Sequence, residues 1–232
     1  MTAHSRQTGR GVRIAIIDSG VHARHPHVNG VAGGVAIDAD GRVHDDFVDR
    51  LGHGTAVTAA IRDLAPAAEL FAVKIFDRQL STRIESLVAA IEWAAQNGMH
   101  VANLSLGTSR REHGTALTAA VDLATAAGAL IVAARDDEGV PYLPGSLPGV
   151  VPVQVDWTCA RHDWRVVSID GVSVLRASGL PREIPGVPPS RNLHGVSFAV
   201  ANATGHLARA LECADDRSAA AAFRLLQMSG SR

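Results

Sequence analysis

Gly11–Ile17 reads GVRIAII and is followed at once by Asp18-Ser19-Gly20, and this stretch decides the fold. A β-branched apolar run that ends at a turn is typical of a buried strand. Strands of a parallel sheet that is covered on both faces show such unbroken apolar runs. The stretch therefore predicts a buried strand with an aspartate at its carboxyl end.

Strands and helices alternate along the rest of the chain. The Ala-rich segment His53–Leu64 predicts a helix that stops before Pro66, and Thr82–Glu85 predicts a capping box in front of a second helix that ends at Gly98. The remaining predicted strands are Glu69–Phe76, Val101–Leu106, Ala129–Ala134 and Val150–Val155, and the remaining predicted helices are Ala116–Ala127 and Val196–Cys213.

This alternation predicts an α/β protein with a three-layer, doubly wound, mostly parallel sheet. We expect one domain over residues 1–232, with its core at about 12–213. The polar segment His22–Arg50 is expected to form loops with one short strand. A long loop is predicted before the last helix, at the prolines Pro181, Pro185, Pro188 and Pro189.

Composition excludes several classes of protein. Hydrophobic residues make up 47% and charged residues 19% of the 232 residues, which argues against a disordered chain or a coiled coil. The net charge of −1, with scattered basic residues, argues against nucleic-acid and membrane-surface partners. The N-terminal Met1–Arg10 is polar and the two cysteines imply no disulfide framework, so we expect a cytoplasmic protein.

Three residue types needed for nucleophilic catalysis stand where ligands bind in open α/β sheets. Asp18 follows a strand, His53 opens a helix after Gly52, and Ser197 opens another after Gly195. In acyl transfer a serine attacks, an imidazole carries its proton, and a carboxylate orients the imidazole. A serine at a helix start also lies beside backbone N–H groups that stabilise an oxyanion.

Four segments in this order resemble the signature motifs of the subtilisin-like serine proteases, the subtilases. They are IAIIDSGV (Ile14–Val21), GHGTAV (Gly52–Val57), NLSLG (Asn103–Gly107) and GVSFA (Gly195–Ala199). The resemblance implies a subtilisin-like fold and peptide-bond hydrolysis by Asp18, His53 and Ser197. We expect no cofactor and no metal site, and we interpret His22, His25 and His27 as loop histidines.

The resemblance also implies a peptide-binding groove. Ser105, Leu106 and Gly107 would form the edge that pairs with the substrate backbone, and Asn103 is left open between a substrate-side role and a structural one. On the opposite side, Ala133, Ala134, Arg135 and Asp136 would line the pocket for the residue before the scissile bond. Arg135 and Asp136 replace the small residues usual there, which predicts a narrowed or charged pocket.

One position departs from the family. The subtilase asparagine that donates a hydrogen bond to the oxyanion is replaced by Asp137, or by Asp136 if the register slips by one residue. An ionised carboxylate cannot donate, and losing such a donor costs roughly 10²–10³ in rate. A protonated carboxyl group can donate. The hypothesis is that Asp137 is an oxyanion donor in an enzyme with weak or acid-favoured activity.

The sequence leads to three functional hypotheses. The first is an intracellular serine endopeptidase that processes a specific peptide or precursor. The second is a peptide-binding protein that keeps the groove but has lost turnover through Asp137. The third is an acyl transferase or peptide cyclase, which uses the same acyl-enzyme but excludes water. The partner in each case is a peptide or protein, and the oligomeric state is left open.

Overall fold

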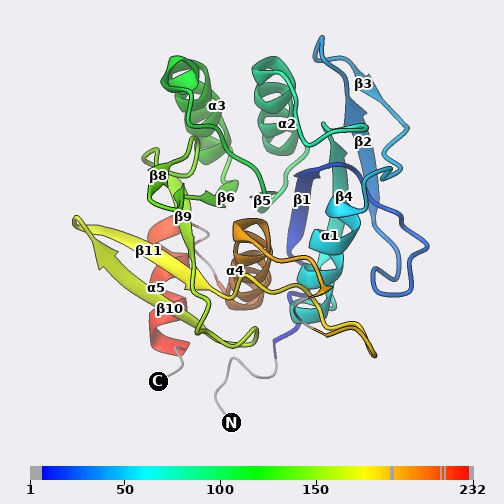
Figure 1. Ribbon diagram of the computed structural model, residues 1–232. Coiled ribbons are helices and arrows are strands. Elements are labelled where there is room, and N and C mark those ends of the chain that lie inside the picture. The colour runs from blue at the N-terminus through cyan, green and yellow to red at the C-terminus, as the bar shows by residue number, and fades with distance from the viewer. Residues whose placement is uncertain (1–6, 189–190, 215, 217, 230–232) are drawn as a thin grey trace.

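The computed structural model describes residues 7–188, 191–214, 216 and 218–229. A nine-stranded sheet forms its centre (Figure 1). In sheet order the strands are β10 (Trp164–Ile169), β11 (Val172–Ala177), β9 (Val150–Val155), β6 (Leu130–Ala134), β5 (Val101–Leu104), β1 (Arg13–Asp18), β4 (Glu69–Lys74), β2 (Gly33–Ile37) and β3 (Val43–His44). The strands from β11 to β2 are parallel, and only the edge strands β10 and β3 pair antiparallel.

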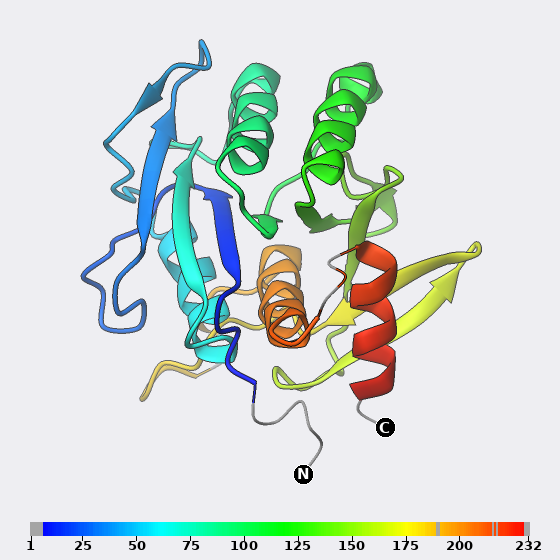
Figure 2. The ribbon, with the colours of Figure 1, turned by 180° about the vertical axis from the view of Figure 1, so that it is seen from behind.

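Helices cover both faces of this sheet (Figures 1 and 2). One face carries α2 (Ile84–Gln96) and α3 (Gly114–Ala126), and the other carries α1 (His53–Leu64), α4 (Val196–Leu211) and α5 (Ala219–Ser229). A 3₁₀ turn at Arg111–His113 leads into α3, and the short strands β7 (Asp136–Asp137) and β8 (Val140–Pro141) form a separate hairpin. The predicted three-layer, mostly parallel architecture is confirmed.

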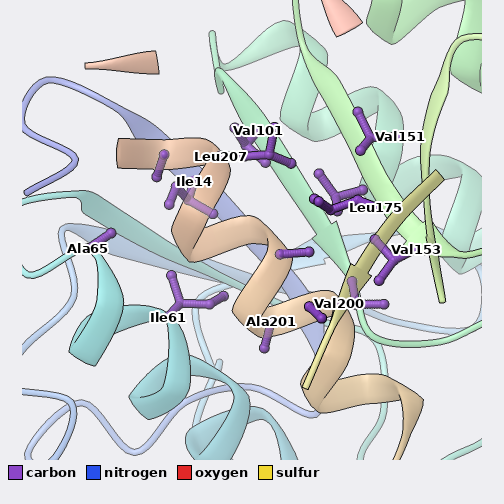
Figure 3. Close-up of a cluster of buried hydrophobic side chains, with 14 of the residues drawn as sticks. Ile14, Ile61, Ala65, Val101, Val151, Val153, Leu175, Val200, Ala201 and Leu207 are labelled. Atoms are coloured by element: carbon purple, nitrogen blue, oxygen red, sulfur yellow. The ribbon is translucent and has the colours of Figure 1, made fainter. Parts of the chain in front are cut away.

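The core has two halves because β1 sends alternate side chains to opposite faces of the sheet. Ile14 and Ile16 join the cluster under α1 and α4, whereas Ala15 and Ile17 join the cluster under α2 and α3. Figure 3 shows the first of these clusters, with α4 side chains lying among those of the central strands and α1. All four β1 residues are fully buried, so apolar burial fixes the strand that ends at Asp18.

Helix α4 approaches α1 closely at Gly205. A Cβ atom built on Gly205 would lie 2.7 Å from the Leu64 Cβ atom, so only glycine fits there without a shift. Most α4 side chains are buried, and the helix packs against β5, β6, β9 and β11. The close packing therefore sets the position of Ser197 relative to the sheet.

Several predicted boundaries are wrong by a few residues. The predicted strands Glu69–Phe76 and Val101–Leu106 end at Lys74 and Leu104, because the chain turns away from the sheet at its carboxyl edge. The helix predicted at Ala116–Ala127 spans Gly114–Ala126, and the one predicted at Val196–Cys213 ends at Leu211.

The predicted capping box does not form. Arg83 is the N-cap residue of α2, and its side chain makes no capping hydrogen bond, so Thr82 stands one position too early for that role.

Two elements were not predicted from the sequence. The hairpin of β10 and β11 turns at Asp170-Gly171, where both residues have positive φ, and an Asp-Gly pair between β-branched runs is the signal that identifies it. Helix α5 follows α4 and packs Leu226 into the core. The segment His22–Arg50 holds two short strands, β2 and β3. The proline-rich loop connects β11 to α4, with Pro189 outside the described residues.

Candidate active site

Asp18 and His53 meet at the carboxyl edge of the sheet. Asp18 is the last residue of β1 and is fully buried, and His53 is the first residue of α1. The His53 Nδ1 atom lies 2.8 Å from Asp18 Oδ1 and 3.0 Å from Oδ2. This contact fixes the ring so that Nδ1 faces the carboxylate and leaves Nε2 for a reacting group.

Asp49 organises the start of α1 around this pair. Its Oδ1 accepts hydrogen bonds from the Ser19 hydroxyl at 2.9 Å and the Gly52 N–H at 2.8 Å, and its Oδ2 accepts from the Thr55 N–H at 2.8 Å. Burial raises the pKa of Asp49, but hydrogen bonds from Thr55 and the loop backbone outweigh it and lower the pKa. An ionised Asp49 therefore neighbours His53.

Glycines allow the backbone segments to converge here. Gly52 takes a left-handed conformation with φ of 84° before the helix begins. A Cβ atom on Gly54 would lie 2.2 Å from the Gly20 carbonyl oxygen and 3.1 Å from Asp18 Oδ1. The His53–Gly54 step is thus fitted against the turn that follows Asp18, and a larger residue at Gly54 would push the two apart.

The pKa of His53 is raised above its ordinary value. Burial lowers the pKa, but the hydrogen bond and charge of Asp18 together with the charge of Asp49 outweigh that effect. A raised pKa makes the imidazole a stronger base but keeps it protonated to higher pH. At pH values above this raised pKa, His53 is neutral and can act as a base.

Ser197 lies on the first turn of α4 and is tied to the loop after β5. Its hydroxyl donates to the Ser105 carbonyl oxygen at 3.1 Å, and the Ser105 hydroxyl donates to the Ser197 carbonyl oxygen at 2.9 Å. Within the described residues no hydrogen bond joins Ser197 to His53. Both residues line one cavity, so the structure brings Asp18, His53 and Ser197 into a single region.

Asn103 is a core residue that hydrogen-bonds to the loop after β5 and to α4. It is fully buried, its Nδ2 donates to the Ser105 hydroxyl at 3.0 Å, and its Oδ1 accepts from the Thr204 hydroxyl of α4 at 2.9 Å. The side chain therefore does not face the groove. Of the two roles left open by the sequence, the structure places Asn103 as the link between the Ser105 edge and α4.

The predicted groove edge Ser105, Leu106 and Gly107 lines the same cavity as His53 and Ser197. Tyr142 packs against this edge, because a Cβ atom on Gly107 would lie 2.6 Å from the Tyr142 ring. A short bridge between Thr108 and Leu143 holds the two segments together. The sequence interpretation missed Tyr142, which has no motif of its own.

The opposite side of the predicted pocket is arranged differently from the expectation. Ala133 and Ala134 are buried in β6, and the Asp136 carboxylate accepts a hydrogen bond from Gln154 at 2.6 Å. Arg135 and Asp136 line a cavity of about 500 Å³ that does not include Ser197. Arg135 also pairs with Asp170 at 3.3 Å. Neither Arg135 nor Asp136 is among the residues that line the Ser197 cavity.

Asp137 sits in the β7–β8 hairpin, paired with Val140. Glu138 and Gly139 form its turn, both with positive φ. Burial, followed by the charge of Asp137, raises the pKa of the Tyr142 hydroxyl. Asp137 is thus close to Tyr142, but it does not line the cavity beside Ser197.

In the described part of the chain, no group of three or more His, Cys, Asp or Glu side chains is arranged to hold a metal ion. Nor does any helix in the described residues combine the length and apolar character needed to cross a bilayer.

Comparison with known proteins agrees with this geometry. Residues 9–229 match the Subtilase family. The chain is 33% identical over 212 residues to subtilisin Savinase of Lederbergia lenta, covering 87% of this chain and 74% of that protein. It is 39% identical over 212 residues to M-protease of Shouchella clausii (strain KSM-K16), with 87% and 52% covered. The chain thus spans about half the length of M-protease.

Solved structures show the same fold. A cold-adapted subtilisin-like serine proteinase superposes with a TM-score of 0.75 at 22% identity, covering 96% of this chain and 83% of that one. The nisin leader peptidase of Lactococcus lactis superposes with a TM-score of 0.75 at 19% identity, covering 98% and 85%. The fold is therefore that of a subtilisin-like serine protease. The chain belongs to the subtilase family and, by class, is a serine endopeptidase.

Proposed function

We propose that this chain hydrolyses peptide bonds with Asp18, His53 and Ser197 as its catalytic triad. The main support for the proposal is that the buried Asp18 carboxylate lies 2.8 Å from His53 Nδ1, and that His53 and Ser197 line the same cavity. Asp18 holds the imidazole in one tautomer and stabilises its protonated form. The raised pKa of His53 has the direction that a general base requires.

The reaction starts when the Ser197 hydroxyl transfers its hydrogen bond from the Ser105 carbonyl to His53 Nε2. His53 then takes the proton while Ser197 Oγ attacks the substrate carbonyl, which gives a tetrahedral oxyanion. His53 returns the proton to the leaving amine, and the acyl-enzyme forms. Water then attacks the acyl group by the same route, which releases the acid and restores Ser197.

We further propose a narrow substrate range, a specific peptide or precursor processed inside the cell. Tyr142 packed on Gly107, at the edge of the cavity beside Ser197, supports selective binding over general digestion. One structural relative, the nisin leader peptidase, carries a peptide-processing activity in its name. The cytoplasmic location stays a prediction that rests on two free cysteines, Cys159 and Cys213. Efficient cleavage of unfolded casein at many sites would contradict a narrow range.

The second candidate is a peptide-binding protein without turnover. The aspartate at position 137, where the family has an oxyanion-donating asparagine, favours this alternative. The two candidates differ at Ser197, because only an activated serine reacts with a phosphonylating probe.

Fluorophosphonate labelling tests the proposal. The purified chain is treated at about pH 5 and about pH 8, and the adduct is mapped by mass spectrometry, with Ser197→Ala as the control. An adduct on Ser197 that Ser197→Ala lacks is expected for the endopeptidase. Absence of labelling at both pH values supports the binding protein instead. Mass analysis of peptide products then separates hydrolysis from ligation by a transferase or cyclase.

A further inference from the structure

The cavity beside Ser197 is large enough to hold part of a peptide. It measures about 510 Å³ and is lined by His53, Ser197, Ser105–Thr108, Arg110 and His113 among others. Apolar side chains from the β4–α2 connection, from α2 and from the groove edge line much of it: Phe76, Leu80, Ile84, Leu87 and Leu106. The cavity that Ser197 lines therefore has a partly apolar wall.

Charge in this cavity is of one sign. Away from the triad, Arg83, Arg110 and His113 line it, and none of its lining residues within the described chain is an aspartate or glutamate. No ion-pair partner of Arg110 is found among the described residues. Arg83 has Asp40 as a partner, but the two are 3.8 Å apart and both side chains are about two-thirds exposed. Such an exposed pair leaves most of the cationic character of Arg83 available.

The backbone adds to the same sign of potential. Helices α2 and α3 begin next to Arg83 and His113, and neither N-terminus has a side-chain cap. Helix N-termini carry a partial positive charge. Glu85 and Glu112 lie in the neighbouring turns, but they do not line the cavity.

We propose that the groove selects peptides that carry acidic side chains on the amino-terminal side of the scissile bond. This inference rests on the proposed function, because a scissile bond exists only if Ser197 attacks a bound peptide. Arg110 and Arg83 are the specificity-determining residues, and they attract carboxylates at the rim of the cavity. Because the rim charges are exposed to solvent, the preference depends on salt.

Binding is measured with the Ser197→Ala variant, so that no turnover intervenes. Three fluorescein-labelled peptides of equal length are compared. The first has three glutamates and a leucine before a central Ala-Ser bond. The second has glutamines in place of the glutamates, and the third has the glutamates after the bond. By fluorescence anisotropy, we expect the first to bind about tenfold more tightly than the other two at about 50 mM salt. That advantage should fall to about threefold at about 300 mM salt.

Variants assign the preference to residues. Arg110→Gln should reduce the ratio of affinities for the first and second peptides to about threefold. The double variant with Arg83→Gln and Arg110→Gln should reduce this ratio to about one. Arg111→Gln is the matched control, because Arg111 carries the same charge one residue away without lining the cavity, and the ratio should change less than about twofold. Arg110→Glu should favour a peptide with lysines in place of the glutamates.

The outcomes separate this inference from the proposed function. Equal affinities for the first two peptides, or an equal effect of Arg110→Gln and Arg111→Gln, would overturn the acidic preference even if the wild-type chain cleaves all peptides. Tighter binding of the third peptide would overturn the assigned side. Tight, Arg110-dependent binding of the first peptide without cleavage by the wild-type chain would uphold the preference and refute hydrolysis.

Discussion

The two sides of the site are built in opposite ways. On one side, Asp18 is fully buried and bonded to His53, with Asp49 supporting the same turn by several hydrogen bonds. On the other side, Asp136 and Asp137 form a half-buried, two-residue strand that pairs with β8, and Gln154 of β9 donates a hydrogen bond to Asp136. A buried, fully bonded network tolerates few substitutions. The acid–base half is therefore held by more hydrogen bonds than the hairpin half, and we expect it to tolerate fewer substitutions.

The strongest test of the fixed half is the removal of its base. His53→Ala should lower kcat on a cleaved peptide by on the order of 10⁶-fold. The triad acts as a unit, and removing its histidine from subtilisin causes a loss of that size. His22→Ala is the control, because His22 is an exposed histidine of the loop after Asp18. A loss of less than about tenfold for His53→Ala would show that another group serves as the base.

The hairpin half is tested by Asp137→Asn. If the carboxylate of Asp137 stands where the oxyanion forms, the asparagine, which can donate a hydrogen bond, should raise kcat by roughly 10²–10³. Steady-state rates check this, with Asp136→Asn as a control because Asp136 is bonded to Gln154. An unchanged or lower rate would remove Asp137 from the mechanism.

The tight contact behind the triad predicts a stability effect. Gly54→Ala places a methyl group against the Gly20 carbonyl oxygen and should lower the free energy of unfolding by about 1–3 kcal/mol or more. Urea denaturation measures it. Gly114→Ala, at the start of α3, is the control, because its Cβ atom would meet nothing within 4 Å, and the change there should stay below about 1 kcal/mol. Similar losses for both variants would mean that the Gly20–Gly54 contact is not tight.

The smallest expected effect concerns the pH profile. Asp49→Asn removes one of the charges that raise the pKa of His53, so that pKa should fall. Because neutral His53 is the active base, the acid limb of kcat/KM should move to lower pH. Asp46→Asn should leave the limb in place, since Asp46 is exposed and pairs with Arg50. A limb that stays or moves upward in Asp49→Asn would contradict the role given to Asp49.

Local sequence patterns were sufficient for the layered fold and for the order of its central elements. The apolar run before Asp18 and the Ala-rich segment after His53 predicted β1 and α1 because burial and helix propensity act over neighbouring residues. The same patterns placed Asp18, His53 and Ser197 at the carboxyl edge. They failed at Arg83, where capping depends on side-chain geometry, and at the β10–β11 hairpin, whose Asp-Gly turn was overlooked.

The sequence by itself determined the class of fold, the family and the identity of the three candidate catalytic residues, because motifs and periodicity are properties of adjacent positions. Only the tertiary structure decided that Asn103 faces α4, that Tyr142 covers Gly107 and that Arg83 and Arg110 share one cavity. Those contacts join segments far apart in the chain. They depend on how helices and loops pack against the sheet, which no local pattern encodes.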